Sequence, residues 1–257
     1  MYTPVQDGIQ KSAPLVSYTE AQPPHDLAEL VHCFWELKTI KPLSKDFNLH
    51  AVPDACVDIM FNEINTTVVG VTALRTTYEV LNLGRDFHYV GIQFLPGVWQ
   101  GSRDEIAHQY IGTSYTGHLP LVETNSRMAG LDFRHKQLVM SELVRQLVHE
   151  KTVQANPLMT KILENLDTIH NVADMAAVTG ISSRQLQRLL TKITGFSPHD
   201  LLKVLRLQQS FKRGYPLLYT DQSHFIRSFR AITGYTPAQY FSKFDVWYIQ
   251  YALTIVR

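Results

Sequence analysis

The stretch SRQLQRLLTKITGFS, residues 183–197, recurs in altered form as SHFIRSFRAITGYT, residues 223–236. Self-similarity of this kind marks a supersecondary unit that is used more than once. Two copies are too few for a solenoid, but they suit a partner that is itself periodic. Identical residues stand 39 positions apart at Arg188 and Arg227, Ile193 and Ile232, Thr194 and Thr233, Gly195 and Gly234, and Pro198 and Pro237.

The sequence around the first copy predicts a helix-turn-helix. Residues 168–179 (TIHNVADMAAVT) have the pattern of a short helix, and Gly180 allows the tight turn that follows it. Ser182 and Gln185 have the spacing of a capping box at the start of the next helix. The buried face of that helix is expected to consist of Leu186, Leu189, Leu190 and Ile193. A short helix, a glycine turn and a second helix make the motif.

The opposite face of the second helix carries basic and amide side chains, which suit recognition rather than catalysis. A B-form major groove admits one α-helix, in which arginine bonds guanine bidentately and glutamine bonds adenine. Two such helices about 34–36 Å apart would enter successive major grooves. For any single arginine, the alternative is an ordinary solvated surface residue. The residues expected to contact DNA are Ser183, Arg184, Gln187, Arg188, Thr191, Lys192, Gln222, Ser223, Ile226 and Arg227.

The charge distribution supports the same interpretation. Residues 156–257 hold twelve Lys and Arg against six Asp and Glu, whereas residues 1–155 hold twelve against seventeen. The net charge of +1 therefore conceals a basic half and an acidic half. Within residues 181–230 the ratio is nine basic to two acidic residues, so the basic charge coincides with the repeated unit. Such asymmetry predicts that the C-terminal half meets a polyanion.

The N-terminal half predicts short strands, and the fold class is therefore α+β. Apolar runs between about Val16 and Val122 alternate with glycine and proline turns, which is typical of a small barrel or sandwich. Periodicity leaves LAELVHCFWELK, residues 27–38, open as helix or strand. Residues 134–150 predict an amphipathic helix that packs on this domain or pairs with a second subunit. The expected organisation is a β-rich domain over 1–133, the helix and linker over 134–155, and an all-α domain over 156–257.

Other classes of protein find little support in the sequence. No apolar run is long enough to span a bilayer, no secretory signal precedes the first domain, and two cysteines make no disulfide framework, so we expect a cytoplasmic protein. No phosphate loop or nucleophile motif indicates an enzyme. The spacing of the candidate metal ligands supports no metal site, and we predict no metal and no cofactor. Those candidate ligands are His32, Cys33, His50, Asp54, Cys56 and Asp58.

The C-terminal hundred residues resemble the AraC/XylS family of bacterial transcription regulators. The resemblance runs through residues 171–207 (NVADMAAVTGISSRQLQRLLTKITGFSPHDLLKVLRL) and then 221–240 (DQSHFIRSFRAITGYTPAQY). It implies two helix-turn-helix units joined by a long helix near residues 198–213. It also places DNA contacts at Arg184, Gln187, Arg188, Gln222, Ser223 and Arg227. The N-terminal stretches LVHCFWELK, VPDACVDIMFN, VVGVT and GIQFLPG are similar to the sensor or dimerisation domain of one subset of this family.

Two departures from the family pattern affect the expected structure. Ala55 stands where glycine is usual, which implies a different backbone at that turn. Residues 210–220 (SFKRGYPLLYT) are about ten residues shorter than the family's segment, so the second unit lacks an obvious first helix. Its apolar residues Phe225, Phe229 and Ile232 then need another cover. We expect that cover from Tyr215, Leu217 and Leu218 or from the apolar tail 246–256, and otherwise a loose second unit.

The sequence as a whole predicts a sequence-specific DNA-binding transcription regulator. The expected partner is double-stranded DNA, and RNA polymerase, a small-molecule effector and a second copy of the chain are further candidates; no membrane is expected. The alternative is a regulatory interaction module whose DNA binding is weakened by the shortened second unit. Aromatic residues of the N-terminal half could line an effector pocket or simply form its core: Trp35, Phe61, Tyr78, Phe87, Tyr89, Phe94 and Trp99.

Overall fold

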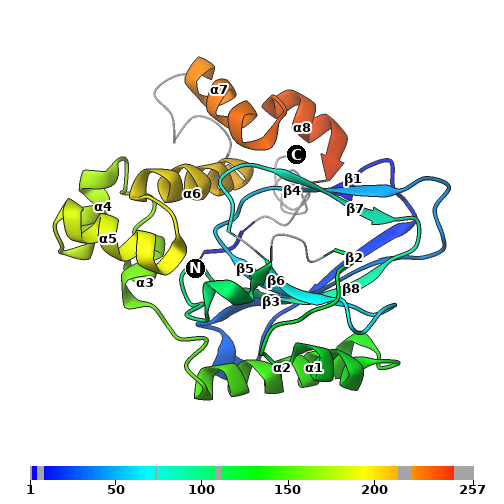
Figure 1. Cartoon of the computed structure of the whole chain (residues 1–257). Coiled ribbons are helices and arrows are strands. Elements are labelled where there is room, and N and C mark those ends of the chain that lie inside the picture. The colour runs from blue at the N-terminus through cyan, green and yellow to red at the C-terminus, as the bar shows by residue number, and fades with distance from the viewer. Residues whose placement is uncertain (1, 5–8, 73, 108–110, 214–221, 246–257) are drawn as a thin grey trace.

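Strands occupy the first part of the chain and helices the second (Figure 1). The computed structural model describes residues 2–4, 9–72, 74–107, 111–213 and 222–245. The strands are β1 (Ile9–Gln10), β2 (Val16–Ala21), β3 (Val31–Thr39), β4 (Phe47–Ala51), β5 (Val57–Asn62), β6 (Val69–Thr72), β7 (Glu79–Gly84), β8 (His88–Phe94), β9 (Ile106–Ala107) and β10 (Phe244–Asp245). The α-helices are α1 (Leu121–Met128), α2 (Phe133–His149), α3 (Pro157–Glu164), α4 (Val172–Thr179), α5 (Ser183–Thr194), α6 (Pro198–Arg213), α7 (Gln222–Thr233) and α8 (Pro237–Lys243).

The N-terminal half is built on a six-stranded sheet in the order β2-β3-β8-β5-β6-β9, in which only the β6–β9 pair is parallel. A two-stranded sheet of β4 and β7 covers one face, and α1 and α2 cover the other (Figure 1). Because both faces are covered, β3 is buried along most of its length and carries no simple alternation of apolar and polar residues, which explains why its sequence left helix and strand open. The predicted α+β class, with a β-rich half before a helical half, is confirmed.

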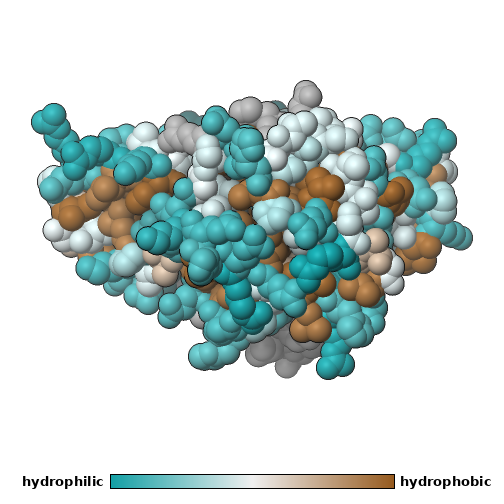
Figure 2. Space-filling view, turned by 60° about the horizontal axis from the view of Figure 1, so that its bottom comes forward, coloured by the Kyte–Doolittle hydropathy of each residue, from teal (hydrophilic) through white to brown (hydrophobic). Residues whose placement is uncertain are grey.

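The amphipathic helix predicted at 134–150 is α2, and it packs on the chain's own sheet. Met140, Leu143, Val144 and Leu147 are buried there, whereas Leu138 is 60% exposed. Figure 2 views the molecule from this side and shows apolar patches separated by hydrophilic atoms. Helix α1 was not predicted, and it joins α2 against the same face.

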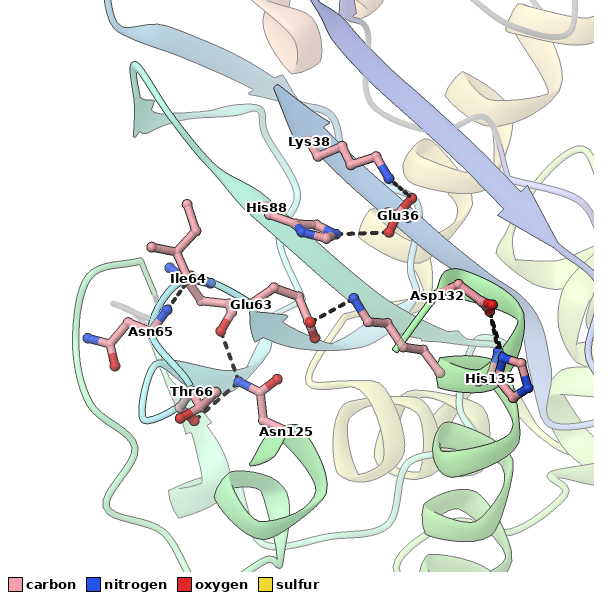
Figure 3. A network of polar contacts seen from close by, with 12 residues as sticks. Glu36, Lys38, Glu63, Ile64, Asn65, Thr66, His88, Asn125, Asp132 and His135 are labelled. Carbon is pink, nitrogen blue, oxygen red and sulfur yellow. Dashed lines mark hydrogen bonds and ion pairs between the residues drawn. The ribbon is translucent and has the colours of Figure 1, made fainter. Parts of the chain in front are cut away.

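A polar network fixes these two helices to the sheet (Figure 3). The ammonium group of Lys136 lies 2.7 Å from the carboxylate of Glu63, with both side chains almost fully buried. Asn125 on α1 donates hydrogen bonds to the carbonyls of Asn62 and Thr66, in the turn between β5 and β6. Burying charges and amides costs free energy unless they have partners, so these contacts favour the observed position of the two helices on the sheet.

The helical half contains two apolar cores. The first joins α3, α4, α5 and α6 around Ile162, Met175, Leu186, Leu190 and Leu205. The second joins the end of α6 to α7 and α8, as described below. Within the described residues, no helix is long and apolar enough to cross a membrane.

The two halves of the chain share several contacts. Strand β1 pairs antiparallel with β10, so the chain's beginning lies beside the last described residues. Gln208 on α6 donates a buried hydrogen bond of 3.0 Å to the carbonyl of Pro53. Ala55 follows in the same turn and packs into the first helical core with a φ of 63°. Ala55 therefore adopts the left-handed conformation that glycine favours, so the different backbone expected at this turn is not found.

Candidate nucleic-acid interface

The first helix-turn-helix forms as the sequence predicts, because local interactions define both of its helices. Asn171 and Asp174 make a capping box at the start of α4, and Ser182 and Gln185 make another at the start of α5. Between them Gly180 has a φ of 72°, which ends α4 in a left-handed turn. Together these satisfy backbone groups that a helix end leaves without partners, and they fix the angle at which α5 leaves α4.

Helix α5 buries one face and exposes the other. Leu186 and Leu190 are fully buried in the first helical core, and Leu189 and Ile193 are partly buried beside them. All six residues predicted to contact DNA on this helix are exposed: Ser183, Arg184, Gln187, Arg188, Thr191 and Lys192. The structure therefore brings these six residues together on one accessible surface, called the α5 face below.

The charge on the α5 face is cationic and uncompensated. Arg184, Arg188 and Lys192 are spaced four residues apart, so they align along one side of the helix. In the described part of the chain no carboxylate forms an ion pair with any of the three. Gln187 interacts with Thr191, whose hydroxyl accepts a hydrogen bond of 3.3 Å from its amide. Charged and amide groups on a protruding helix can contact both phosphates and base edges.

The second unit reuses α6 as its support. Residues 214–221, between α6 and α7, lie outside the described residues, and within those described no further helix separates the two. The phenyl ring of Phe211, near the end of α6, meets that of Phe229 on α7 edge to face, with centroids 5.6 Å apart. Tyr240 on α8 packs against both rings, at 5.4 Å and 5.7 Å.

The apolar side of α7 is thus covered by described residues of α6, α8 and the sheet half. Phe225, Phe229 and Ile232 are buried as expected, against α6, α8 and Val52 of the sheet half. The expected covers, Tyr215, Leu217, Leu218 and the tail 246–256, lie outside the described residues. Among the predicted contact residues on this helix, Gln222, Ser223 and Arg227 are exposed and Ile226 is half-buried. The second unit therefore presents an exposed polar side like that of the first, with fewer charges.

A cavity lies between the two sheets of the N-terminal half. Trp35, Leu37 and Met60 line it from the large sheet, and Leu49 and Leu81 line it from β4 and β7. Its polar lining includes two ordered pairs: Trp35 Nε1 donates to Asp58 Oδ1 at 2.9 Å, and Gln93 Nε2 donates to Asp54 Oδ2 at 2.8 Å. An apolar chamber with a few oriented polar groups is the usual form of a small-molecule site.

Only part of the aromatic set considered for an effector pocket faces that cavity. Trp35 lines it, whereas Phe61 and Phe94 lie in the core between the sheet and α2. Tyr78 instead packs against His50, at the junction with α7. Trp99 lines a separate groove between the sheet half and α5.

The six residues considered as metal ligands do not form one cluster. His50 hydrogen-bonds the carbonyl of Thr233, whereas Asp54, Cys56 and Asp58 line the cavity between the sheets. Burial, together with the charge of Asp54, raises the pKa of Cys56 well above its usual value, so this thiol stays protonated. The remaining two, His32 and Cys33, lie beside Glu20, whose side chain the sequence did not single out.

Comparisons with known proteins give limited information about this chain. A family model described as "Domain of unknown function (DUF6597)" matches residues 19–113. No curated protein matches the sequence. Solved structures of ToxT from Vibrio cholerae are similar at a distance. One from strain O395 has a TM-score of 0.42 and 11% identity, covering 77% of this chain and 94% of that one.

A second ToxT structure, with an unsaturated fatty acid bound, has a TM-score of 0.40 and 9% identity. It covers 95% of this chain and 98% of that one. Similarity this distant does not define what the present chain binds. The functional argument therefore depends on the side chains of the α5 face and their surroundings.

Proposed function

We propose that this chain is a sequence-specific DNA-binding transcription regulator of the AraC/XylS type, and not an enzyme. The observation that carries the proposal is the α5 face, where six predicted contact residues are exposed on the second helix of a fully capped helix-turn-helix. Arg184, Arg188 and Lys192, which have no ion-pair partner among the described residues, supply positive charge to this face, and Gln187 supplies an amide. These are the groups that bind phosphates and read base edges in a major groove.

The two kinds of contact make different contributions to binding. Cationic groups that neutralise phosphates release counterions, so the affinity they provide falls steeply as salt concentration rises. Base contacts by Arg188 or Gln187 distinguish one sequence from another. On α7, Arg227 and Gln222 would repeat these roles in an adjacent groove, while Ile226 offers apolar contact to a thymine methyl group.

The N-terminal half is proposed as the sensor domain of the regulator, with residues 1–133 as the domain, 134–155 as helix and linker, and 156–257 as the DNA-binding domain. The cavity lined by Trp35 and Leu81 is the proposed effector site. Because Val52 and Pro53 border this cavity and also contact the helical half, a ligand there could bias how the helices are held.

A second candidate is a regulatory interaction module with weak DNA binding. Its supporting observation is the second unit, where α6 replaces a separate first helix and α7 is held against the sheet half at Val52. If that contact fixes α7 in a position that does not suit the adjacent groove, only α5 reads DNA.

The deciding experiment is selection of bound fragments from sheared genomic DNA of the source organism, followed by nuclease footprinting. A footprint over two adjacent major grooves per chain supports the regulator with both units docked. A footprint over one groove supports a regulator that reads with α5 alone. If no fragment is enriched and affinity is insensitive to sequence, with or without a cell extract of small molecules, the regulator is contradicted and the interaction module is favoured.

A further inference from the structure

Three metal-binding side chains meet on one face of the large sheet. They are Glu20 on β2 and the adjacent pair His32 and Cys33 on β3. One donor atom from each, a carboxylate oxygen, an imidazole nitrogen and the Cys33 Sγ, lies within 4.8 Å of the other two. This cluster lies in the N-terminal half and is separate from the α5 face.

An irregularity in β3 is what places His32 and Cys33 together. Successive side chains of a regular strand point to opposite faces, so adjacent residues would not share a ligand. The pairing of β3 with β8 shifts at this point: Val31 faces Phe94, but Cys33 faces the very next residue, Gln93. His32 is therefore the extra residue of a β-bulge, which re-aims side chains.

The core contacts of β3 confirm the effect of the bulge. Val31 and Phe34 both pack in the core on the side of α2, although they are three positions apart and a regular strand would place them on opposite faces. Cys33 and Trp35 both pack on the opposite side, with β4 and β7. The two residues between Val31 and Phe34 thus turn towards that opposite side together. Glu20 pairs with Trp35 in the ladder, so it stands diagonally across from Cys33 within side-chain reach.

We propose that Glu20, His32 and Cys33 bind a divalent transition-metal ion, zinc in the first place. Thiolate with imidazole is a donor combination typical of zinc, and carboxylate completes a set of three. The charges also balance, since a thiolate and a carboxylate together neutralise a divalent ion. Three protein ligands leave one tetrahedral position for water or a small ligand, and His32 and Glu20 keep the site in contact with solvent.

A neighbouring hydroxyl already orients one of the ligands. The hydroxyl of Tyr18 donates to Glu20 Oε1 at 2.9 Å, which leaves the second carboxylate oxygen to bind the ion. The thiol of Cys33 donates a weak hydrogen bond to Gln93 Oε1, with 4.0 Å between sulfur and oxygen, and this contact is given up when the thiol loses its proton to bind the ion. Outer groups that hold ligands in place are a regular part of metal sites.

Metal binding at this place would tie β2 to β3. Strand β2 is at one end of the six-stranded sheet and pairs only with β3 there. An ion held by both strands adds a cross-link at the end of the sheet, and any group that binds the native state raises its stability. It would also connect the metal to the proposed effector cavity, because the cavity residues Trp35 and Gln93 neighbour Glu20 and Cys33 respectively.

The test is metal binding by the untagged full chain. The protein is stripped with a chelator, equilibrated with Zn²⁺, desalted and analysed for metal content. We expect about one zinc per chain for the wild type, and less than about a tenth of that for Cys33→Ser. Glu20→Gln changes an exposed residue and cannot disturb the core; it should weaken zinc binding about tenfold or more in a chelator competition. Cys56→Ser and His88→Gln are matched controls that should keep the full zinc content.

Cobalt gives a second measurement that reports the ligands directly. Bound Co²⁺ should show a thiolate charge-transfer band in the near ultraviolet, present in the wild type and in Cys56→Ser but absent in Cys33→Ser. His32→Gln should shift the visible bands of the cobalt protein. The proposal is overturned if the wild type retains less than about a tenth of an equivalent of zinc, or if Glu20→Gln and Cys33→Ser bind zinc as tightly as the wild type.

Discussion

His50 on β4 donates a hydrogen bond of 2.8 Å from its Nε2 to the carbonyl oxygen of Thr233, the last residue of α7. The neighbouring carbonyl, that of Ile232, accepts from the backbone N–H of Tyr78 at 2.7 Å. The last carbonyls of a helix have no partner within the helix. The sheet half therefore caps α7, and it does so with groups more than 150 residues away in sequence.

Protonation of His50 should weaken this junction. Burial lowers the pKa of His50. The hydrogen bond to Thr233 acts in the opposite direction, and the positive charge of Lys243 lowers the pKa further. The unfolded chain therefore binds the proton more readily, and unfolding free energy should fall as pH drops below about 6.5. The facing groups are Tyr78, Tyr235 and Tyr240, with Lys243 the only charge among these neighbours.

The measurement is urea unfolding at about pH 7.5 and about pH 5.5 for the wild type and His50→Gln. Glutamine can still donate an N–H to Thr233 but does not titrate. The stability loss on acidification should therefore be smaller in the variant than in the wild type. The ten other histidines titrate in both proteins and contribute equally to both losses. Equal losses would show that His50 is not the group responsible.

A comparison of two glycines tests the same junction without changing pH. Gly195 and Gly234 follow α5 and α7 in left-handed conformations, with φ values of 76° and 78°. A Cβ at Gly195 meets nothing within 4 Å, whereas one at Gly234 would lie 2.7 Å from the ring of Tyr78. Gly195→Ala should cost about 1–2 kcal/mol from conformation alone, and Gly234→Ala about 1–3 kcal/mol more from the clash.

Urea unfolding of both variants gives the difference, and Tyr78→Ala supplies the control. In a Tyr78→Ala background the additional cost of Gly234→Ala should disappear, because the ring that it meets is gone. If Gly234→Ala and Gly195→Ala cost the same with Tyr78 present, the close approach of Tyr78 to α7 is contradicted.

The first helix-turn-helix could be predicted because its determinants are local. Ser182 and Gln185 are three residues apart, Gly180 decides the turn by its own conformation, and the spacing of Leu186 and Leu190 defines the buried face. A sequence displays such relations directly. The α+β class was equally accessible, since short apolar runs with turns precede a region of helical periodicity.

The parts that could not be predicted depend on distant contacts. The cover of α7 comes partly from Val52, and its cap from His50 and Tyr78, none of which is near it in sequence. The cluster of Glu20, His32 and Cys33 was missed because the side chains of adjacent strand residues are expected to point to opposite faces of the sheet. Nothing in the sequence marks the bulge at His32. The DNA contacts of α5 and α7 remain predictions.

The buried ion pair beneath the sheet should be sensitive to removal of either partner (Figure 3). Lys136 and Glu63 lie 2.7 Å apart with side chains 3% and 5% exposed. Lys136→Met leaves a buried carboxylate without its partner and should cost about 3–5 kcal/mol. The double variant Lys136→Met, Glu63→Leu removes both charges and should recover most of that loss in urea unfolding. A loss in the double variant equal to the sum of the single losses would contradict the pairing.

Arg188→Ala tests the central claim about the α5 face. If Arg188 reads a base, the variant should lose about 1–3 kcal/mol of binding at one base position and tolerate other bases there. Lys192→Ala, at the end of the same row, should instead weaken binding to all sequences and reduce the salt dependence by about one counterion. Titration of a selected DNA fragment and its single-base variants at several salt concentrations separates the two.

Arg134→Ala, an exposed arginine on α2, is the control and should bind as the wild type does. If Arg188→Ala and Arg134→Ala bind alike, α5 is not the helix that reads DNA.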